Sequence, residues 1–551
     1  MNWIRKHRVR LLSVLAGLCL ISATVTDPYF EITKNLEIFT SVFKELNIYY
    51  VDETDPGALM KKAIDEMLKS LDPYTVYYPE SKIEDAMFMQ TGQYGGIGTL
   101  VNTIHGKITI TEPYQGYPAA KAGLIAGDVI LKINGKSVVG KKHDEVTDQL
   151  TGTPGSTVEI EFQRPGETST RTAKITREEI KVPDVPYFSL LPDSTTGYIQ
   201  LTGFTQTASQ EVRAAYTNLK QRNMQRLILD LRGNGGGLLR EAVAIVNFFV
   251  PKGTKIVETK GRNEEWNKEY TAINDPLDTQ IPLVVLVDHG SASASEIVSG
   301  SLQDLDRAVI LGEESYGKGL VQQTKDLIYN TKMKLTVAKY YTPSGRCIQR
   351  LDYSNRDAST GKVDAKADSL LQVFKTANGR EVLDGRGIAP DVQVKEDLSS
   401  HLLEALFENW IIFDWVTQYQ QEHPTIPTPS AFSMSDQEYT RFIEYAKTQD
   451  FHYDTQTEKL YQDLINTAKE ENYYTGSENE FQALLRKIEP NKEDDLNKFK
   501  PQIKRVLESE IVTRYYYQRG RSENTLREDA YIIRALKVFR DEHQQILRGK
   551  G

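Results

Sequence analysis

Hydrophobic and polar positions follow a different spacing in each successive segment of the chain. Apolar residues recur at helical spacing across 27–90, as in LEIFTSVFKELNIYY and ALMKKAIDEMLKSL, which predicts an N-terminal helical segment. They alternate with polar residues across 91–182, as in GKITITEP and STVEIEFQR, which predicts a domain built mainly from strands. Both patterns occur in 183–395, and 396–551 returns to helical spacing with many charged residues and tyrosines.

Apolar strands and amphipathic helices alternate within 183–395. RLILDLRG and PLVVLVD have the continuous apolar runs of buried strands, whereas SQEVRAAYTNLKQRN and LLREAVAIVNFFV have the spacing of amphipathic helices. Such β-α-β alternation predicts an α/β domain with a largely parallel sheet. The chain as a whole is therefore expected to be a multidomain α/β protein with a helical segment at its N-terminus and a helical region at its C-terminus.

Residues 1–26 form a separate N-terminal segment. A basic start precedes the apolar run LLSVLAGLCLISATV, and this order is typical of an export signal. The run is short for a full membrane span, which takes about 20 residues, yet it lacks a good small-x-small cleavage site. The segment is thus either a signal peptide or a retained membrane anchor. Either predicts that the remaining chain is exported to the periplasm or cell envelope, held in the inner membrane if the anchor is kept.

The net charge and the cysteine and histidine content argue against several kinds of partner and site. The net charge is -9, and no basic stripe follows the first ten residues, which argues against a nucleic-acid partner. Cys19 lies in the apolar segment, so a structural disulfide with Cys347 and a cysteine-based metal site are not expected. The 8 histidines form no HExxH motif and no close pair, so we predict no metal.

The stretch GSASASE, residues 290–296, lies directly after the strand PLVVLVD and at the entry to a predicted helix. A nucleophile at this place would stand on a rigid scaffold with backbone N–H groups nearby. Serines at helix starts, however, are usually N-caps. From these residues alone, Ser291, Ser293 and Ser295 remain open to both interpretations.

A nucleophilic serine needs a base. His289 is close in sequence, but no partner is evident that would orient it, and a loop residue is the plainer interpretation. Lys318 lies between Gly317 and Gly319 after the apolar run AVILG. A lysine can accept a proton only when neutral, which requires burial that lowers its pKa. An ordinary surface lysine is the alternative.

The strand-rich segment 91–182 resembles PDZ domains. The resemblance rests on Ala-Gly-Leu-x-x-Gly-Asp-x-Ile-x-x-Ile-Asn-Gly at 122–135, and GGIG at 95–98 stands where PDZ domains keep their carboxylate-binding loop. Consecutive glycines let several N–H groups converge on an anion, beside which an extended peptide can add as a strand. The resemblance thus implies that Gly96, Ile97 and Gly98 bind a peptide carboxylate. His143 is either a groove residue or, as we expect, a surface residue.

The segments LDLRGNGGG, GSASASE, ESYGKGLVQQ and YYTPSGRCIQ together resemble the carboxyl-terminal processing proteases, also called tail-specific proteases. The resemblance covers about 30–395 and implies a ClpP/crotonase-like α/β protease core with an inserted PDZ domain. It places the catalytic serine at Ser293 and the general base twenty-five positions later at Lys318. Gln322, four residues further on, falls where the family holds the ammonium of that lysine.

The same resemblance suggests roles for the neighbouring residues. The backbone N–H of Ala294 and one from Gly235 or Gly236 are the expected oxyanion donors, because preorganised donors are needed where charge develops. Ser291 and Ser295 are expected to be supporting residues. Glu296 and Asp304 are interpreted as structural, since a carboxylate paired with the lysine would keep it charged.

The leading interpretation is an exported serine endopeptidase that cleaves near the C-termini of envelope proteins, whose tails the PDZ domain captures. No cofactor is implied. A non-catalytic PDZ scaffold that binds C-terminal tails is the alternative, and an acyl-CoA-type enzyme on a related core is disfavoured by the PDZ domain. The region 396–551 is expected to dock an adaptor, mediate self-association or cover the core.

Overall fold

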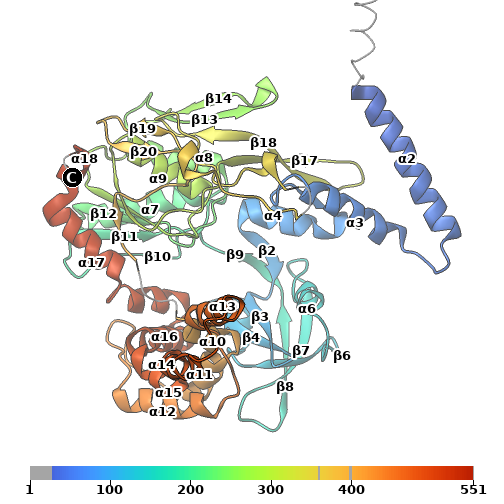
Figure 1. The fold of residues 1–551 in the computed structure, drawn as a ribbon, viewed down its shortest axis with the longest axis vertical. Helices are drawn as coiled ribbons and strands as arrows, with labels where there is room; N and C mark the ends of the chain where they lie inside the picture. Colours follow the sequence, from blue (N-terminus) through green and yellow to red (C-terminus); the bar gives the residue numbers. More distant parts are fainter. Residues whose placement is uncertain (1–27, 358–359, 396–399, 550–551) are drawn as a thin grey trace, which may run out of the picture. The chain divides into compact units, whose positions relative to one another are not determined.

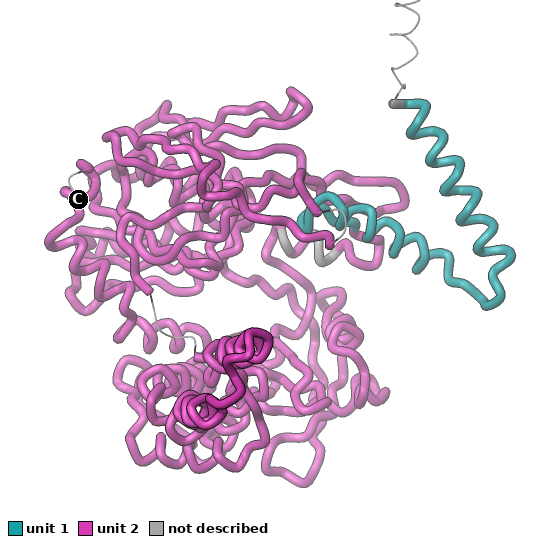
Figure 2. Tube along the Cα trace, in the orientation of Figure 1, with its two compact units in different colours: residues 1–77 teal, residues 78–551 magenta. Residues whose placement is uncertain are grey.

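A computed structural model describes residues 28–357, 360–395 and 400–549 (Figure 1). The chain divides into two compact units, residues 1–77 and 78–551 (Figure 2). Among the described residues, no helix combines the length and apolar character needed to cross a membrane. The predicted signal or anchor segment lies in 1–26, outside the described residues.

The first unit contains the helices α2 (Pro28–Tyr49) and α3 (Pro56–Lys69), where the sequence predicts helices. Asp55 begins α3 as its N-cap, and its carboxylate accepts hydrogen bonds from the N–H groups of Gly57 and Ala58. This satisfies two of the N–H groups that the first helical turn leaves without a partner.

The predicted PDZ segment forms a sheet with strand order β3-β4-β5-β7-β8, while β2 pairs with β9. Its alternating residues face inward as the pattern predicts, and Ile110, Val158 and Ile160 are completely buried. The elements of this part are β2 (Gln93–Gly96), β3 (Thr99–Ile104), β4 (Lys107–Pro113), α5 (Pro118–Lys121), β5 (Val129–Ile133), β6 (Lys136–Ser137), α6 (His143–Leu150), β7 (Thr157–Gln163), β8 (Thr170–Thr176) and β9 (Glu178–Lys181).

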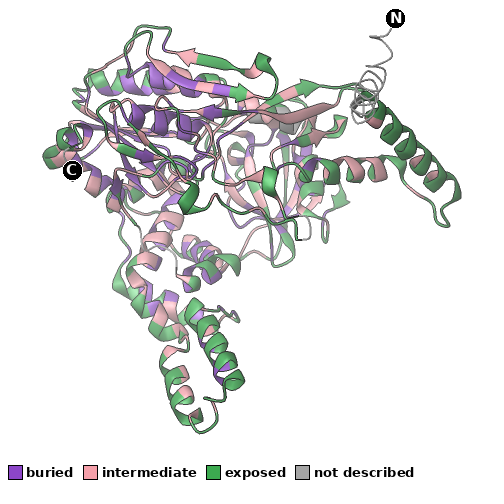
Figure 3. Cartoon of the chain, turned by 45° about the horizontal axis from the view of Figure 1, so that its top comes forward, coloured by how far each residue is buried: buried purple, intermediate pink, exposed green. Residues whose placement is uncertain are grey.

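A six-stranded sheet with order β10-β11-β12-β15-β16-β21 forms the centre of the α/β part. All its pairings are parallel except that of the edge strand β10. Its strands are β10 (Tyr187–Leu190), β11 (Thr196–Gln200), β12 (Arg226–Asp230), β15 (Leu283–Val287), β16 (Val309–Gly312) and β21 (Val392–Gln393). Every residue of β15 is buried, because both faces of the sheet are covered. Figure 3 colours the described residues by burial and shows buried residues gathered in the interior of the strand-containing part.

Different helices cover the two faces of this sheet. Leu227, Leu229 and Val285 pack in one core with α7 (Ala208–Gln221), α8 (Leu239–Asn247) and α9 (Ala294–Asp304). The intervening residues, such as Ile228 and Val284, pack in a second core against the last helices of the chain. These are α17 (Ala530–Lys537), the π-helical turn η5 (Val538–Glu542) and α18 (His543–Leu547). Burying one such aliphatic side chain contributes about 1.5–3 kcal/mol.

A second, antiparallel sheet contains the order β18-β13-β14, with β17 paired to β18. The long hairpin of β17 and β18 follows directly after Lys318. The strands of this sheet are β13 (Lys255–Gly261), β14 (Lys268–Thr271), β17 (Leu320–Asp326) and β18 (Lys332–Tyr341). The remaining short elements are β1 (Val76–Tyr78), η1 (Glu80–Lys82), α4 (Ile83–Thr91), η2 (Glu264–Trp266), η3 (Tyr353–Asn355), η4 (Asp368–Leu370), β19 (Val373–Lys375) and β20 (Glu381–Leu383).

The C-terminal helices contribute to two cores. One core belongs to them alone and includes Leu406, Phe442 and Leu507. The helices that contribute to it are α10 (His401–Glu408), α11 (Ile411–Glu422), α12 (Asp436–Thr448), α15 (Lys492–Lys498) and α16 (Lys500–Thr525). Between α12 and α15, α13 (Gln456–Glu470) and α14 (Glu478–Ile488) contact each other through Tyr461 and Phe481. The other is the second face of the six-stranded sheet, against which the chain packs after α16. The last helices therefore complete the α/β part.

Candidate active site

Ser293 lies at the turn between β15 and α9, as the N-cap residue of that helix. Its φ of 55° and ψ of -109° place a non-glycine residue in a sparsely populated region of backbone conformation. Such a conformation costs on the order of 1–3 kcal/mol and persists only where the surroundings hold it. The Ser293 N–H donates to Glu296 Oε2 at 2.7 Å, which is one such constraint.

The two flanking serines are completely buried, whereas Ser293 is only partly buried. The Ser291 hydroxyl donates to the carbonyl of Leu231 at 2.8 Å, and the Ser295 hydroxyl donates to the carbonyl of Asn234 at 2.8 Å. Both hydroxyls thus tie the serine segment to the loop that follows β12. The supporting hydrogen bonds expected for Ser291 and Ser295 are present.

Lys318 lies in the loop between β16 and β17, half-buried between the buried residues Gly317 and Gly319. Its N–H donates to Glu296 Oε2 at 2.9 Å, the same carboxylate oxygen that accepts the Ser293 N–H. The Tyr340 hydroxyl lies 2.7 Å from the Lys318 carbonyl oxygen and 3.1 Å from that of Ser293. Glu296 and Tyr340 each bridge the two segments that carry the predicted serine and lysine.

Glu296 has a larger part in this geometry than the sequence suggested. It is completely buried and also accepts hydrogen bonds from the Ser315 hydroxyl at 2.6 Å and the Gly317 N–H at 2.7 Å. Burial raises the pKa of Glu296 above its ordinary value, and the hydrogen bonds it accepts counter part of that rise. The Ser-x-x-Glu spacing of a capping box could have indicated its contact with Ser293, but not those with 315–318.

Tyr340 was not singled out by sequence reasoning. It is 1% exposed, and burial raises the pKa of its hydroxyl well above the usual value, with the Glu296 charge adding to the rise. The hydroxyl therefore stays protonated and able to donate. No local signal in YYTPSGRCIQ marks this tyrosine, because its partners lie 22 and 47 residues away.

Gln322 lies on β17 and is partly buried. Its side-chain amide donates to Thr336 Oγ1 on β18 at 3.3 Å. The predicted role of Gln322, to hold the ammonium of the lysine, stays a prediction.

Gly236 lies against the serine turn. Its φ of +97° disfavours other residues, and a Cβ there would come within 2.9 Å of both the Ala294 nitrogen and the Ser293 Cβ. Its own N–H donates to Asn234 Oδ1 at 2.9 Å. Gly235 has open space around it, with nothing within 4 Å of an added Cβ. The structure thus brings the glycine loop and the predicted oxyanion donor Ala294 together.

The predicted carboxylate-binding loop precedes β3 in the PDZ segment. The Ile97 carbonyl accepts the Ala119 N–H at 2.8 Å, and the Gly98 carbonyl accepts the Tyr114 N–H at 2.9 Å. Gly98 has a φ of +72°, and a Cβ there would lie 2.5 Å from Tyr117 Cβ. The loop is therefore held in place by the hydrogen bonds that its carbonyls accept and by the burial of the Ile97 side chain, which is 2% exposed. Peptide binding by the N–H groups of 96–98 stays a prediction.

The histidines near these loops make local contacts. His289 Nε2 lies 3.0 Å from Glu313 Oε2, and its side chain is 71% exposed, in agreement with a loop residue. His143 begins α6, is partly exposed and donates through Nε2 to the Val101 carbonyl on β3 at 3.0 Å. No cluster of metal-ligating side chains occurs among the described residues.

Asp304, predicted to be structural, lies at the end of α9. It is buried and forms an ion pair with Arg346 at 2.8 Å. Asp304 also accepts the Ser344 N–H at 3.0 Å. The pair thus joins α9 to the segment that follows β18.

Comparison with known proteins adds independent information. Residues 195–353 match the family model described as "Peptidase family S41", and residues 109–164 match "PDZ domain". Residues 402–539 match "Probable PDZ-protease, C-terminal helical domain". This last match covers the region for which the sequence alone suggested no assignment.

Curated relatives match along much of their length. A "Carboxy-terminal-processing protease" of Bartonella bacilliformis is 37% identical over 339 residues, which are 61% of this chain and 77% of the relative. A "Probable CtpA-like serine protease" of Staphylococcus aureus is 35% identical over 360 residues, 63% of this chain and 71% of the relative. A solved "photosystem II D1 C-terminal processing protease" is 28% identical, with a TM-score of 0.36, over 65% of this chain and 93% of its own.

The family and domain matches confirm the predicted multidomain α/β class with a PDZ domain, a protease core and a C-terminal helical region. They favour the catalytic interpretation over a non-catalytic tail-binding scaffold. The chain belongs to the carboxy-terminal-processing proteases, PDZ-containing serine peptidases of family S41.

Proposed function

We propose that the chain hydrolyses peptide bonds near the C-termini of protein substrates, with Ser293 as nucleophile and Lys318 as general base. One observation above all supports the pairing: a single carboxylate oxygen of Glu296 accepts the N–H groups of both Ser293 and Lys318. Because that carboxylate is completely buried, the two backbone segments have little freedom to separate.

The reaction proceeds through an acyl-enzyme. The neutral Lys318 amine takes the proton from Ser293 Oγ as the oxygen bonds to the scissile carbonyl carbon. When the tetrahedral intermediate collapses, the carbon–nitrogen bond breaks and the Lys318 ammonium returns its proton to the leaving amine. Water then attacks the ester with Lys318 again as base, which releases the acyl product and regenerates Ser293.

The N–H of Ala294 and one N–H of the glycine loop stabilise the oxyanion. Since the Gly236 N–H already donates to Asn234, Gly235 is the favoured second donor. The side chain of Gln322 orients the Lys318 ammonium. Preorganised donors of this kind typically contribute about 10²–10³ in rate for each donor.

Lys318 and Ser293 are tested together with a fluorophosphonate probe, which labels activated serines, and with a peptide substrate. Ser293→Ala and Lys318→Ala should each lose labelling and cleavage while keeping the wild-type melting temperature. Lys339→Ala is the control, because it removes an exposed lysine on β18, in the hairpin that follows Lys318. This variant should retain both labelling and cleavage. Labelling or turnover at the wild-type rate in either dyad variant would exclude this mechanism.

The PDZ domain captures the free C-terminus of the substrate through the N–H groups of Gly96, Ile97 and Gly98. Gly98 supports this role, because its positive φ and close approach to Tyr117 admit only glycine without strain. Nests of successive N–H groups bind anions. Together with the export proposed for segment 1–26, this binding mode makes envelope proteins with exposed tails the expected substrates.

Segment 1–26 exports the chain and, if retained, anchors it in the inner membrane. The basic start and the apolar run after it support this proposal. Fused to a reporter that is active only outside the cytoplasm, residues 1–30 should yield activity. An inactive fusion that accumulates in the cytoplasm would contradict export.

The C-terminal helices supply a surface for a protein adaptor or a second copy of the chain. Leu460 and Leu464 on α13 and Leu484 on α14 support this, because they are exposed apolar residues. Two results together would contradict this proposal. Light scattering would show a monomer, and the wild type and a variant with these leucines exchanged for serine would capture the same proteins in equal amounts.

A further inference from the structure

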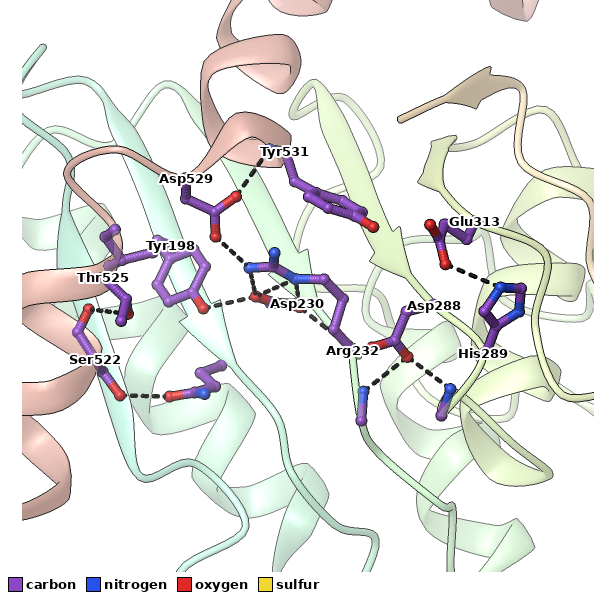
Figure 4. Close-up of a pocket in the computed structure, with 14 residues that line it drawn as sticks. Tyr198, Asp230, Arg232, Asp288, His289, Glu313, Ser522, Thr525, Asp529 and Tyr531 are labelled. Atoms are coloured by element: carbon purple, nitrogen blue, oxygen red, sulfur yellow. Dashed lines mark hydrogen bonds and ion pairs between the residues drawn. The ribbon is translucent and has the colours of Figure 1, made fainter. Parts of the chain in front are cut away.

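A polar cavity of about 610 Å³ lies where β11, β12 and β15 end, and the end of α16 with the chain that follows it forms one of its walls (Figure 4). Arg232, Gly233 and Gly290 line it from the loops that lead to the glycine loop and to Ser293. The opposite lining comes from 522–531. The C-terminal segment therefore reaches the base of both loops of the candidate active site.

Arg232 is the contact between that segment and the glycine loop. Its Nη2 lies 2.7 Å from Asp529 Oδ2 and 2.6 Å from Asp230 Oδ2, and its guanidinium stands 4.6 Å from the centre of the Tyr531 ring. The Tyr198 hydroxyl donates to Asp230 at 2.7 Å. Arg232 is thus held between two carboxylates and an aromatic ring, with 19% of its side chain exposed.

Asp529 is itself fixed in place. Its Oδ1 accepts the N–H groups of Tyr531 at 2.8 Å and Ile532 at 3.2 Å, so it is the N-cap of α17. Tyr531, Ile532 and Ala535 are buried in the second core of the six-stranded sheet. One carboxylate oxygen caps the docked helix, and the other holds Arg232.

Short hydrogen-bonded links connect Arg232 to the serine turn. The next residue, Gly233, donates its N–H to Asp288 Oδ1 at 2.8 Å, and the same oxygen accepts the Ser291 N–H at 3.0 Å. One residue further, the Asn234 carbonyl accepts the Ala292 N–H at 3.0 Å. A displacement of Arg232 would therefore be transmitted to 233–236 and to the Ser293 turn.

We propose that Asp529 is a positioning residue: by holding Arg232, it keeps 233–236 in the geometry that the oxyanion requires. The inference rests on the proposed Ser293 and Lys318 mechanism, and it assigns the C-terminal segment a role in catalysis as well as in packing. Misplacement of catalytic groups by about 1 Å can cost on the order of 10² in rate.

Asp529→Asn is the test, because asparagine still caps α17 but lacks the charge that holds Arg232. We expect kcat for a tail peptide to fall about 10- to 100-fold with KM within about twofold, since the loss lies in the transition state. Fluorophosphonate labelling should slow in proportion. Asp541→Asn, which removes an exposed carboxylate paired with Arg540 in the same C-terminal segment, is the matched control and should keep the wild-type kcat.

Arg232→Lys provides a second test, because it leaves the N-cap of α17 intact while removing the planar guanidinium that reaches both carboxylates. Its loss of kcat should resemble that of Asp529→Asn, and the double variant should lose little more, because both changes break the same contact. Asp529→Glu, which keeps the charge, should recover part of the rate.

The proposal fails if folded Asp529→Asn or Arg232→Lys turns over at the wild-type rate, or if only the melting temperature falls. Should Asp529→Asn not fold, Arg232→Lys alone decides between these outcomes. Ser293→Ala in the same assay tests the proposed function separately, because activity in that variant would refute the mechanism whatever Asp529 does.

Discussion

Ser291, Ser293 and Ser295 occupy alternate positions in GSASASE, yet their surroundings give them different chemistry. The first and third are completely buried and donate to backbone carbonyls. The middle serine is partly exposed and has a φ of 55°. The hydroxyls of Ser291 and Ser295 are thus already engaged with carbonyls, which favours Ser293 as the proposed nucleophile of the three.

Gly236→Ala tests the close approach of the glycine loop to that serine. An added Cβ would lie 2.7 Å from the Ala292 carbonyl oxygen, so the loop would have to move away from Ser293. Activity should fall about 10²–10³-fold, as on loss of an oxyanion donor, measured as kcat/KM for a peptide. Gly253→Ala has the same positive-φ strain with open space around it and should keep full activity. Equal activity in the two variants would contradict the assigned contact.

At the level of elements, helix α7 is joined to the segment that leads into β15 through Asp278. This carboxylate accepts hydrogen bonds from the Lys220 ammonium and the Tyr216 hydroxyl, both at 2.9 Å, and from the N–H groups of Gln280 and Ile281. Burial opposes ionisation, but these donors outweigh it and lower the pKa of Asp278 to about 2. The strand that carries the serine turn is thereby tied to the helix covering it.

Asp278→Asn should lower the free energy of unfolding at neutral pH. Because the folded-state pKa lies below the unfolded value of about 3.9, the contribution of Asp278 is complete above pH 5 and is lost as the pH falls towards 2. Urea unfolding of both proteins between pH 7 and pH 3 should show the difference narrowing on acidification. A difference that stays constant or widens would contradict this assignment.

At the scale of the whole molecule, the C-terminal region binds the PDZ domain as well as the protease sheet. Arg521 on α16 pairs with Glu112 on β4 at 3.3 Å, and Asp414 on α11 lies 2.7 Å from His105 Nε2. Burial lowers the pKa of Arg514, also on α16, to about 10. The helices thus contact the PDZ domain and, through α17 and α18, the protease sheet.

A substrate with an amidated C-terminus tests whether tail capture governs cleavage. Without its carboxylate, the peptide cannot use the N–H groups of 96–98, so kcat/KM should fall at least about tenfold, corresponding to about 1.4 kcal/mol of lost binding. Acetylation of the opposite end is the matched control and should change little. Equal turnover of amidated and free peptides would remove the PDZ domain from substrate selection.

The sequence by itself determined the order of the segments, the strand and helix character of each, and the positions of the serine, lysine and glycine motifs. Periodicity and short motifs act over a few residues, and that range is enough to predict β15, α9 and the GGIG loop. The PDZ segment and the protease core were recognisable from short motifs of the same range.

Only the tertiary structure decided that Glu296 and Tyr340 bridge the serine and lysine segments, and that α17 and α18 cover the second face of the sheet. The Arg232–Asp529 contact joins residues 297 positions apart. Such contacts depend on how folded elements pack, because side chains distant in the chain meet only once their helices and sheets have docked. No local sequence pattern indicates these long-range contacts.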